Sequence, residues 1–342
     1  MKPITLKDLA ERLGVSVTTI SKALKDYPDI GKETKDQVKQ LAKELNYKPN
    51  IHAVTLRSQK SKTLGVIVPK LDHHFFSQVL NGIISEANLH GYLVITLFSD
   101  DSIEKEKEQV GLLIDKRVDG VLMALSNETL AYDQDHIMEI LAHNIHLVLF
   151  DRISSTIPCS KVHIDDQKAA FNAVNHLLAN GAKTIAYIGG PTLPMNYRKR
   201  LNGYKQALNA WGIQEKAEFI FHSEPDDINS AYQFTLDILR KHPEIDGIFA
   251  ATDILAVGAL NALTDAGKSI PDEVSIIGFS NWFVTQHMRP SLSSVEQPSI
   301  SMGQKAVSIM IDEINKTDKH ILVQQQSVQL PTQLILRNST KN

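Results

Sequence analysis

The spacing of hydrophobic residues at the start of the chain predicts three short amphipathic helices. The first follows a capping-box pattern at Thr5–Asp8 and ends at Gly14, and the second follows a Ser16 cap. The third begins near Lys32 and ends at Asn46. The hydrophobic positions are Leu6, Leu9, Ala10 and Leu13, then Val17, Ile20, Ala23 and Leu24, then Val38, Leu41, Ala42 and Leu45. Two short helices around a glycine-containing turn, followed by a third, are typical of a helix-turn-helix domain.

From Leu64 onwards, short apolar runs alternate with amphipathic helical stretches. The runs are LGVIVP (64–69), YLVITLF (92–98), GVLMAL (120–125) and HLVLFD (146–151), then TIAYIGG (184–190), FIF (219–221), GIFAA (247–251) and VSIIGFS (274–280). Strands that are apolar throughout are buried on both faces, and their alternation with helices indicates βαβ units in a parallel sheet. The series restarts once. The predicted fold is therefore a small all-α helix-turn-helix headpiece plus a hinge helix, then an α/β core of two doubly wound parallel-sheet lobes.

The changes of pattern also set the expected domain boundaries. We expect a helix-turn-helix domain at 1–49, a hinge helix and linker at 50–62, and a core at 63–342. The chain is expected to leave the first lobe near 160–165 and to return near 290–296. The expected lobes are about 63–161 plus 291–322, and about 162–290 plus 323–342.

Composition and charge favour a soluble protein that binds nucleic acid at one end. The chain is 42% hydrophobic and 22% charged, as is ordinary for globular proteins. Residues 1–60 hold twelve Lys and Arg against seven Asp and Glu, so they carry +5 and the remainder −8. The start has no apolar signal-peptide core, no apolar run reaches the length of a membrane span, and Cys159 is the single cysteine. We therefore expect a cytoplasmic protein without disulfides.

The second predicted helix is the expected DNA reader. Near its start it exposes Val17, Thr18, Ser21 and Lys22. Methyl groups suit the thymine methyl, hydroxyls suit phosphates or base edges, and lysine suits guanine. Helix spacing alone fits a three-helix protein-interaction module about equally well, and the basic charge favours DNA.

Residues 50–58 are too short and too β-branched to form a stable helix alone. Residues 59–63 are a polar linker. We expect the short helix to fold only when a second copy of the chain and DNA supply the packing.

The segment TLKDLAERLG through NYKPN (5–50) resembles, in register and without gaps, the headpiece of the LacI/GalR family of bacterial repressors. The helix-turn-helix, the third helix and the ending Tyr47-x-Pro49-Asn50 all agree. The predicted core resembles that family's core and the periplasmic sugar-binding proteins, whose ligand lies between the lobes. The resemblance covers essentially the whole chain, and it implies a DNA-binding repressor controlled by an effector.

The resemblance implies roles for individual residues. The base-facing residues are Val17, Thr18 and Lys22. The residues that hold the DNA backbone are Ser16, Thr19 and Ser21. In the hinge helix, Ala53 packs closely and Leu56 enters the minor groove as a wedge. The complete expected DNA-binding set is Thr5, Leu6, Ser16, Val17, Thr18, Thr19, Ser21, Lys22, Asn50, Ala53, Leu56 and Arg57.

Two positions of this part depart from the family pattern. Val54 stands where many members carry arginine, which removes a minor-groove or phosphate contact. Gly31 replaces the usual serine cap of the third helix, at a cost of a few tenths of a kcal/mol.

Polar and aromatic residues follow several core strands, and ligands of such sheets bind outside the carboxyl ends of the strands. The expected effector-binding residues are His73, Phe75, Phe76, Asp151, Asn196, Tyr197, Arg198, Thr252, Asp253, Ser280, Asn281 and Trp282. Carboxylate, guanidinium and amide groups pair with hydroxyls, and aromatic rings stack on C–H faces. The set suits a carbohydrate effector.

The resemblance strengthens some of these candidates and leaves others open. Arg198 falls where the family's effector-binding arginine lies, and Asp151 matches an acid between the lobes, although both fit ordinary ion pairs as well. Asp253 fits either a ligand contact or a helix cap, and the aromatic candidates fit either a ligand site or lobe core. Ser280 stands where most members carry an aspartate, so it brings a hydrogen bond without charge, and the effector is not identified.

The sequence contains no pattern of a catalytic site. A G-x-S-x-G elbow, a P-loop and a dinucleotide fingerprint are all absent. The pair His73-His74 has no further ligands at metal-binding spacing, and Cys159 lacks a catalytic signature. We expect no enzyme, no cofactor and no metal.

We expect a homodimer on a pseudo-palindromic operator, with effector binding altering how the two hinge segments meet. The resemblance implies that the helix at about 75–90 lies at or near the dimer interface. Family members that form tetramers do so through a leucine heptad tail, which this sequence lacks, so we expect a dimer. The alternatives are a free periplasmic sugar-binding protein, a cytosolic enzyme, and an activator or corepressor-dependent regulator. The headpiece opposes the first and the missing catalytic pattern the second, whereas the third has the same parts.

Overall fold

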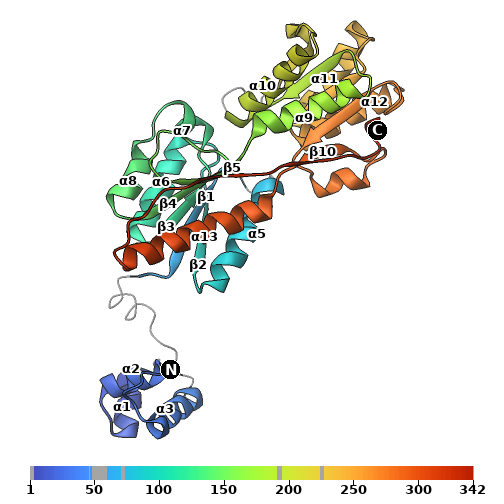
Figure 1. The fold of residues 1–342 in the computed structure, drawn as a ribbon. Helices are drawn as coiled ribbons and strands as arrows, with labels where there is room; N and C mark the ends of the chain where they lie inside the picture. Colours follow the sequence, from blue (N-terminus) through green and yellow to red (C-terminus); the bar gives the residue numbers. More distant parts are fainter. Residues whose placement is uncertain are drawn as a thin grey trace. The chain divides into compact units, whose positions relative to one another are not determined.

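The computed structural model describes residues 4–45, 47, 60–70, 74–190, 195–223 and 227–341. The chain divides into two compact units, Met1–Ser61 and Lys62–Asn342, and each is described by itself. Figure 1 shows the helical first unit, here called the headpiece, in dark blue and the α/β core in the remaining colours.

The headpiece is a three-helix domain built on the predicted caps. Its helices are α1 (Leu6–Leu13), α2 (Val17–Leu24) and α3 (Lys32–Glu44). The Thr5 N–H donates to Asp8 Oδ2 at 2.7 Å and the Asp8 N–H donates to Thr5 Oγ1 at 3.3 Å, which completes the capping box. Gly14 ends α1 at a φ of 64°, a left-handed conformation that glycine adopts without strain. The buried core is Leu9, Ala10, Ile20, Ala23 and Val38. The predicted helix-turn-helix is confirmed.

The first lobe of the core is a six-stranded parallel sheet in the order β11-β5-β4-β3-β1-β2. Its strands are β1 (Thr63–Val68), β2 (Leu93–Phe98), β3 (Gly120–Met123), β4 (His146–Phe150), β5 (Ser160–Ile164) and β11 (Ser327–Leu330). Its helices are α5 (His74–Leu89), α6 (Ile103–Asp115), α7 (Asn127–Ala131), α8 (Asp135–Ala142) and α13 (Ser299–Asp318). Val66 and Val68 belong to the hydrophobic cluster of α5 and α13, whereas Ile67 belongs to that of α6 and α8. Helices therefore cover both faces of the sheet.

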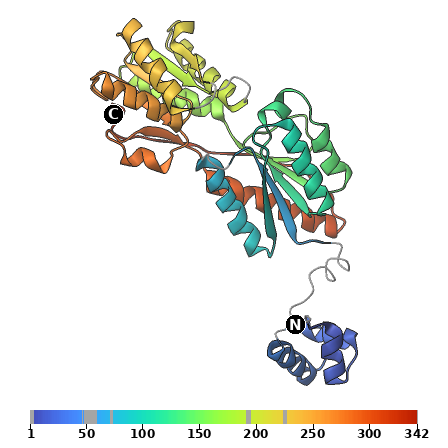
Figure 2. The same cartoon turned by 180° about the vertical axis from the view of Figure 1, so that it is seen from behind.

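The second lobe repeats this architecture in the order β12-β10-β9-β8-β6-β7. Its strands are β6 (Ile185–Gly189), β7 (Ile220–His222), β8 (Gly247–Ala250), β9 (Ser275–Phe279), β10 (Ser293–Glu296) and β12 (Gln333–Ile335). Its helices are α9 (Asp166–Ala179), α10 (Met195–Ala210), α11 (Ile228–Lys241) and α12 (Asp253–Asp265), with short 3₁₀ turns η1 (Ala217–Phe219) and η2 (Phe283–His287). The pairing is parallel except between β10 and β12. The predicted two doubly wound lobes are confirmed (Figures 1 and 2).

The sheets place the crossings between the lobes differently from the expected boundaries. β5 continues to Ile164 in the first sheet, β10 belongs to the second sheet, and β11 returns to the first. The expected ranges 291–322 and 323–342 therefore assigned β10 and β11 to the wrong lobes. Both strands are short and partly polar, so neither is among the apolar runs of the sequence, and their residues do not show which sheet they pair with.

Two glycines allow α5 and α13 to pack closely along one face of the first lobe. A Cβ atom at Gly82 would lie 2.2 Å from the Ile300 carbonyl oxygen, and one at Gly303 would lie 2.2 Å from the Val79 carbonyl oxygen. Backbone atoms cannot yield as the end of a side chain can, so an added methyl would separate the two helices.

Gly303→Ala is therefore expected to lower the free energy of unfolding by about 1–3 kcal/mol. Gly111→Ala is the matched control, because Gly111 lies within α6 and a Cβ there would meet nothing within 4 Å. The control should be neutral or more stable by about 0.5–1 kcal/mol. Urea unfolding measures both, and equal effects would contradict the close helix crossing.

Candidate functional site

The start of α2 presents the predicted DNA-reading residues at the surface. Val17 is 44% exposed although it is apolar, and Thr18 is exposed. Ser16 caps the helix, since its Oγ accepts from the Thr19 N–H at 3.0 Å and lies 2.8 Å from Thr19 Oγ1. Thr19 and Ser21 are half-buried. Val17 and Thr18 are thus the side chains of this set most open to a partner, while Ser16 and Thr19 fix the helix start.

Lys22, the predicted guanine reader, forms an ion pair with Asp29. This pairing holds the pKa of the Asp29 carboxyl below its usual value, chiefly through the hydrogen bond from Lys22. A DNA site would therefore compete with Asp29 for the ammonium group. At the start of α1, Thr5 is exposed and engaged in the capping box, and Leu6 packs partly against the headpiece core.

Four predicted DNA-binding residues and one predicted effector residue lie outside the described residues. They are Asn50, Ala53, Leu56 and Arg57, and His73.

In the core, Asp151 and Asn196 connect the two lobes. Asp151 follows β4 of the first lobe at a φ of 56° and is 8% exposed. Asn196 lies in the first turn of α10 in the second lobe, and its Nδ2 donates to Asp151 Oδ2 at 3.2 Å. Asp151 Oδ1 has no hydrogen-bond partner among the residues that the structure describes. Two sequence-predicted residues thus meet at the boundary between the lobes.

The electrostatic environment makes the charge on Asp151 costly. Burial, and after it repulsion from Asp166, raise the pKa of this carboxyl, while Arg152, Arg200 and the Asn196 hydrogen bond lower it. The net result is a pKa of about 6. Asp151 is thus a buried acid with an unused acceptor, a feature that marks functional sites.

Replacing Asp151 by asparagine is expected to raise the free energy of unfolding at pH 7 by roughly 3 kcal/mol. The carboxyl pKa rises from 3.8 to about 6 on folding, so the folded chain holds the proton more tightly and the native protein loses stability as pH rises through this window. The asparagine side chain carries no charge, so the gain should vanish below the unfolded pKa of 3.8 and be complete above about pH 7. Urea unfolding of both chains at several pH values measures the gain, and a gain independent of pH would contradict burial of the charge as its cause.

Arg200 fills the second-lobe side of this boundary and was not predicted from the sequence. It is 5% exposed, and its Nε and Nη2 atoms lie 2.9 and 2.8 Å from Asp166 Oδ1. Its Nη1 donates to the Ala251 carbonyl at 2.8 Å, and its guanidinium lies 3.7 Å from the centre of the Phe279 ring. The signal was present in the helix, because Arg200 continues the buried stripe of Gly203, Tyr204 and Ala207.

Arg198, the arginine favoured by the family resemblance, is exposed two residues before Arg200. Residues two apart on a helix do not share a face, which explains why one arginine is buried and the other is not. Tyr197 is half-buried, with its ring 6.0 Å from the Arg200 guanidinium. The effector role of Arg198 stays a prediction.

Arg152, a residue at the same strand end that is not in the expected effector-binding set, directly follows Asp151. Its Nη1 donates to Asn127 Oδ1 at 3.0 Å and forms an ion pair with Asp101, and its guanidinium lies 5.6 Å from the Phe76 ring centre. These partners come from three separate segments, so no local sequence pattern could reveal them. We call Asp151, Arg152, Asp166, Asn196 and Arg200 the inter-lobe cluster.

Thr252 and Asp253, predicted for the effector, have structural partners within the second lobe. Thr252 is the N-cap of α12 and accepts from the Leu255 N–H at 3.3 Å. Asp253 accepts from the Ser294 hydroxyl at 2.7 Å and from the Trp282 N–H at 2.6 Å, and burial raises its pKa to about 6. The carboxylate therefore anchors the turn after β9, and the cap is Thr252.

The side chains of the turn after β9 also have hydrogen-bond partners elsewhere in the core. The Ser280 hydroxyl donates to Gln297 Oε1 at 2.8 Å. Asn281 Nδ2 donates to Glu296 Oε1 at 3.3 Å, and Asn281 Oδ1 accepts from Arg337 at 2.7 Å. Gln297, Glu296 and Arg337 come from distant parts of the chain, so sequence spacing could not indicate them.

The aromatic candidates divide between core and surface. Phe75 and Phe76 are buried, with ring centres 5.2 Å apart. Trp282 is half-buried and its ring meets Phe283 edge-on at 6.1 Å. Phe283 is exposed, and its ring lies 5.6 Å from that of His74 in the first lobe. This contact is a second link between the lobes.

Other kinds of site are not supported in the part of the chain that the structure describes. Its residues contain no group of three or more His, Cys, Asp or Glu side chains that could hold a metal ion. None of the described helices has the length and hydropathy needed to span a bilayer. A hollow of about 560 Å³ lies at α11 and α12, lined in part by Tyr232 and Asp265, and it contains none of the predicted effector residues.

Comparison with known proteins agrees with this arrangement. Residues 5–50 match the bacterial regulatory proteins of the lacI family, and residues 174–340 match the periplasmic binding protein-like domain. The chain is 32% identical to the HTH-type transcriptional regulator RegA of Clostridium saccharobutylicum, over 98% of this chain and 99% of that protein. It is 33% identical to the ribose operon repressor of Halalkalibacterium halodurans, over 98% and 97%. The Lac repressor dimer bound to operator and the anti-inducer ONPF is similar in structure, with a TM-score of 0.86, 26% identity and 99% of each chain covered.

A helix-turn-helix headpiece joined to a two-lobed core of the periplasmic-binding type defines a DNA-binding transcriptional regulator rather than an enzyme. The chain belongs to the lacI family of bacterial regulatory proteins.

Proposed function

We propose that this regulator is a homodimeric repressor whose operator affinity is set by a small polyhydroxylated effector, bound at the inter-lobe cluster. One observation carries the proposal: Asp151 is buried between the lobes, shares one oxygen with Asn196 of the second lobe, and has no partner for the other among the described residues. A buried acceptor without a donor is costly, and a ligand hydroxyl placed there would remove that cost.

The groups around Asp151 favour a neutral ligand with several hydroxyls. Arg152 and Arg200 are already paired with Asp101 and Asp166, so neither cation is left for a free phosphate. Carboxylates and amides in such a set bind hydroxyl groups, and the Phe76 ring next to Arg152 supplies an apolar wall. The ribose operon repressor among the similar proteins supports a sugar-type effector.

On the DNA side, each headpiece would occupy one half-site of a pseudo-palindromic operator. The exposed start of α2 would enter the major groove, with Val17 and Thr18 against bases and Lys22 exchanging Asp29 for DNA. We assign 1–49 to the DNA-binding domain and 50–62 to a hinge in which Leu56 enters the minor groove. The Lac repressor dimer, which is bound to operator, supports this mode.

Effector binding in the core would be coupled to DNA binding by the headpiece, because the effector contacts both lobes at once. A ligand bonded to Asp151 and to the α10 side of the boundary favours one arrangement of the lobes over another. That arrangement determines how the two hinge segments of the dimer meet.

A thermal-shift screen of the full chain tests the ligand part of this proposal. The panel contains D-ribose, D-glucose, D-galactose and cellobiose, their available phosphate esters, and nucleobases. A ligand at a hundred times its Kd stabilises the folded chain by about 2.7 kcal/mol, so a binding sugar should raise Tm by several degrees. Asp151→Asn should respond to none of them. Stabilisation by no sugar, or an equal response of Asp151→Asn, would contradict the assignment.

A further inference from the structure

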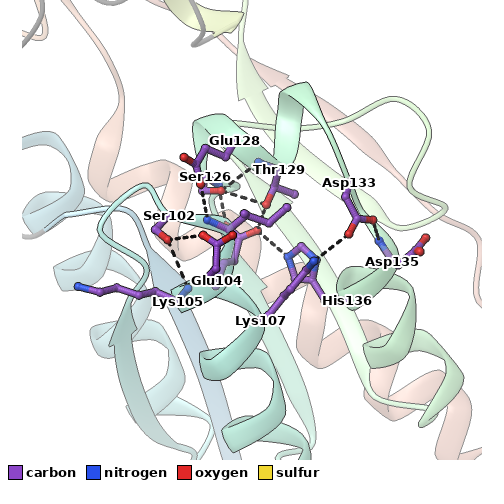
Figure 3. Close-up of polar contacts among 12 residues, drawn as sticks. Ser102, Glu104, Lys105, Lys107, Ser126, Glu128, Thr129, Asp133, Asp135 and His136 are labelled. Atoms are coloured by element: carbon purple, nitrogen blue, oxygen red, sulfur yellow. Dashed lines mark hydrogen bonds and ion pairs between the residues drawn. The ribbon is translucent and has the colours of Figure 1, made fainter.

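A buried carboxylate in the first lobe of the core accepts hydrogen bonds from three elements. Glu106 lies in α6 and is fully buried. It accepts from the Ser126 N–H at 2.6 Å, from the Thr129 hydroxyl, and from His136 Nε2 at 2.8 Å. Figure 3 shows Ser126, Thr129 and His136 converging from the turn after β3, from α7 and from α8. We call these four residues the Glu106 cluster.

The cluster determines where α7 begins. Ser126 is the N-cap of α7, its Oγ accepts from the Thr129 N–H at 3.1 Å, and its hydroxyl donates to Thr129 Oγ1 at 2.9 Å. Glu128 ties the same turn back to α6 by accepting from the Ile103 N–H at 2.8 Å. The first turns of α6 and α7 are therefore joined by hydrogen bonds to two carboxylates. The bond to Glu106 is buried, where such bonds are strong, and the bond to Glu128 is partly buried.

The residue after Ser126 connects this junction to the inter-lobe cluster. The Asn127 N–H donates to Asp101 Oδ1 at 3.3 Å, and Asn127 Oδ1 accepts from Arg152 at 3.0 Å. Asp101 itself pairs with Arg152 and lies directly before the Ser102 cap of α6. Both partners of Arg152 thus belong to the α6 and α7 starts that Glu106 holds together.

We infer that Glu106 is a positioning residue for the effector site: by holding the starts of α6 and α7 together, it fixes Asn127 and Asp101, and through them the Arg152 guanidinium beside Asp151. The hydrogen bonds of Glu106 lead to Ser126, Thr129 and His136, so its influence reaches Arg152 through the side chain of Asn127 and through Asp101. The inference rests on the proposed function only in assigning Arg152 to an effector site. The structural connection between Glu106 and Arg152 does not depend on any ligand.

A double-mutant cycle in the full chain tests the link. Glu106→Gln and Arg152→Met are measured singly and together by urea unfolding, then again in an Asn127→Ala background. Distant sites without shared partners are additive, whereas residues in one network are not. We expect the two losses to be smaller together than their sum, by about tenfold in the unfolding equilibrium constant. This coupling should fall when Asn127 is replaced, because the route through its side chain is lost while the route through its N–H and Asp101 remains. Additive losses with Asn127 present, or a coupling that the replacement of Asn127 leaves unchanged, would overturn the inference.

Glu313, a second buried glutamate, serves as the control for a purely structural role. It also accepts from a serine hydroxyl, that of Ser160 in β5, and its other oxygen lies 3.7 Å from His146 Nδ1 at the start of β4. Neither contact is with a partner of Arg152. Glu313→Gln with Arg152→Met should therefore be additive. If Glu106→Gln does not fold, Thr129→Val removes one donor of the cluster and takes its place in the cycle.

The two proposals fail in different ways. Additivity would remove Glu106 from the site while sugar-induced stabilisation persisted. Absence of stabilisation by any sugar would remove the effector assignment while the coupling persisted.

Discussion

Replacing Arg200 by methionine is expected to lower the free energy of unfolding by about 3–5 kcal/mol, because breaking a buried ion pair leaves an uncompensated charge. Arg200 and Asp166 are 5% and 3% exposed. Asp151 is a second buried carboxylate, and it interacts electrostatically with both. The methionine would leave Asp166 and Asp151 facing each other without the cation that holds them. Urea unfolding at pH 7 measures the loss.

Arg198→Met is the matched control on the same helix. Arg198 is exposed, so its removal should change stability by no more than about 0.5 kcal/mol. Asp166→Asn in the Arg200→Met background should recover part of the loss, since it removes the unpaired charge. Equal losses for Arg198→Met and Arg200→Met would show that the buried ion pair is not what stabilises the lobe boundary.

Leu56→Ala is expected to weaken operator binding by about 10- to 100-fold, the equivalent of the roughly 1.5–3 kcal/mol gained by burying a leucine side chain. The reason is that a wedge between base pairs acts only on DNA that is bent at the site, so the loss should be confined to specific DNA. Titration of operator and of unrelated DNA at one salt concentration measures both affinities, since salt changes each strongly.

Leu322→Ala serves as the control for this prediction. Leu322 belongs to the core unit and is 91% exposed, so its replacement should leave both affinities unchanged. An equal loss of specific and non-specific affinity in Leu56→Ala would contradict the wedge.

Much of the fold was predictable because its signals are local. The capping box at Thr5 and Asp8 and the left-handed Gly14 depend on residues within one turn, and the buried strands are continuous apolar runs. The lobes to which β10 and β11 belong were not predictable. β11 pairs with β5, more than a hundred residues earlier in the chain, and the place of β10 depends on the order of strands in the second sheet.

The candidate site shows the same limit. The sequence selected Asp151 and Asn196, whose side chains lie in hydrogen-bond contact, and their effector role stays a prediction. The family resemblance selected Arg198, whereas the helix periodicity favours Arg200 as the buried arginine. The sequence did not indicate that Asp101 and Asn127 are partners of Arg152. Asp253 and Asn281 have the expected polar side chains, but long-range partners engage them within the second lobe.

The most direct test of effector control is the operator affinity of the full chain with and without the sugar that most raises its Tm, measured at one salt concentration. We predict that the sugar weakens operator binding by about 5- to 150-fold, and that Asp151→Asn binds operator normally without responding to the sugar. An operator affinity that the sugar leaves unchanged would contradict control through the inter-lobe cluster, and one that the sugar tightens would replace induction by corepression.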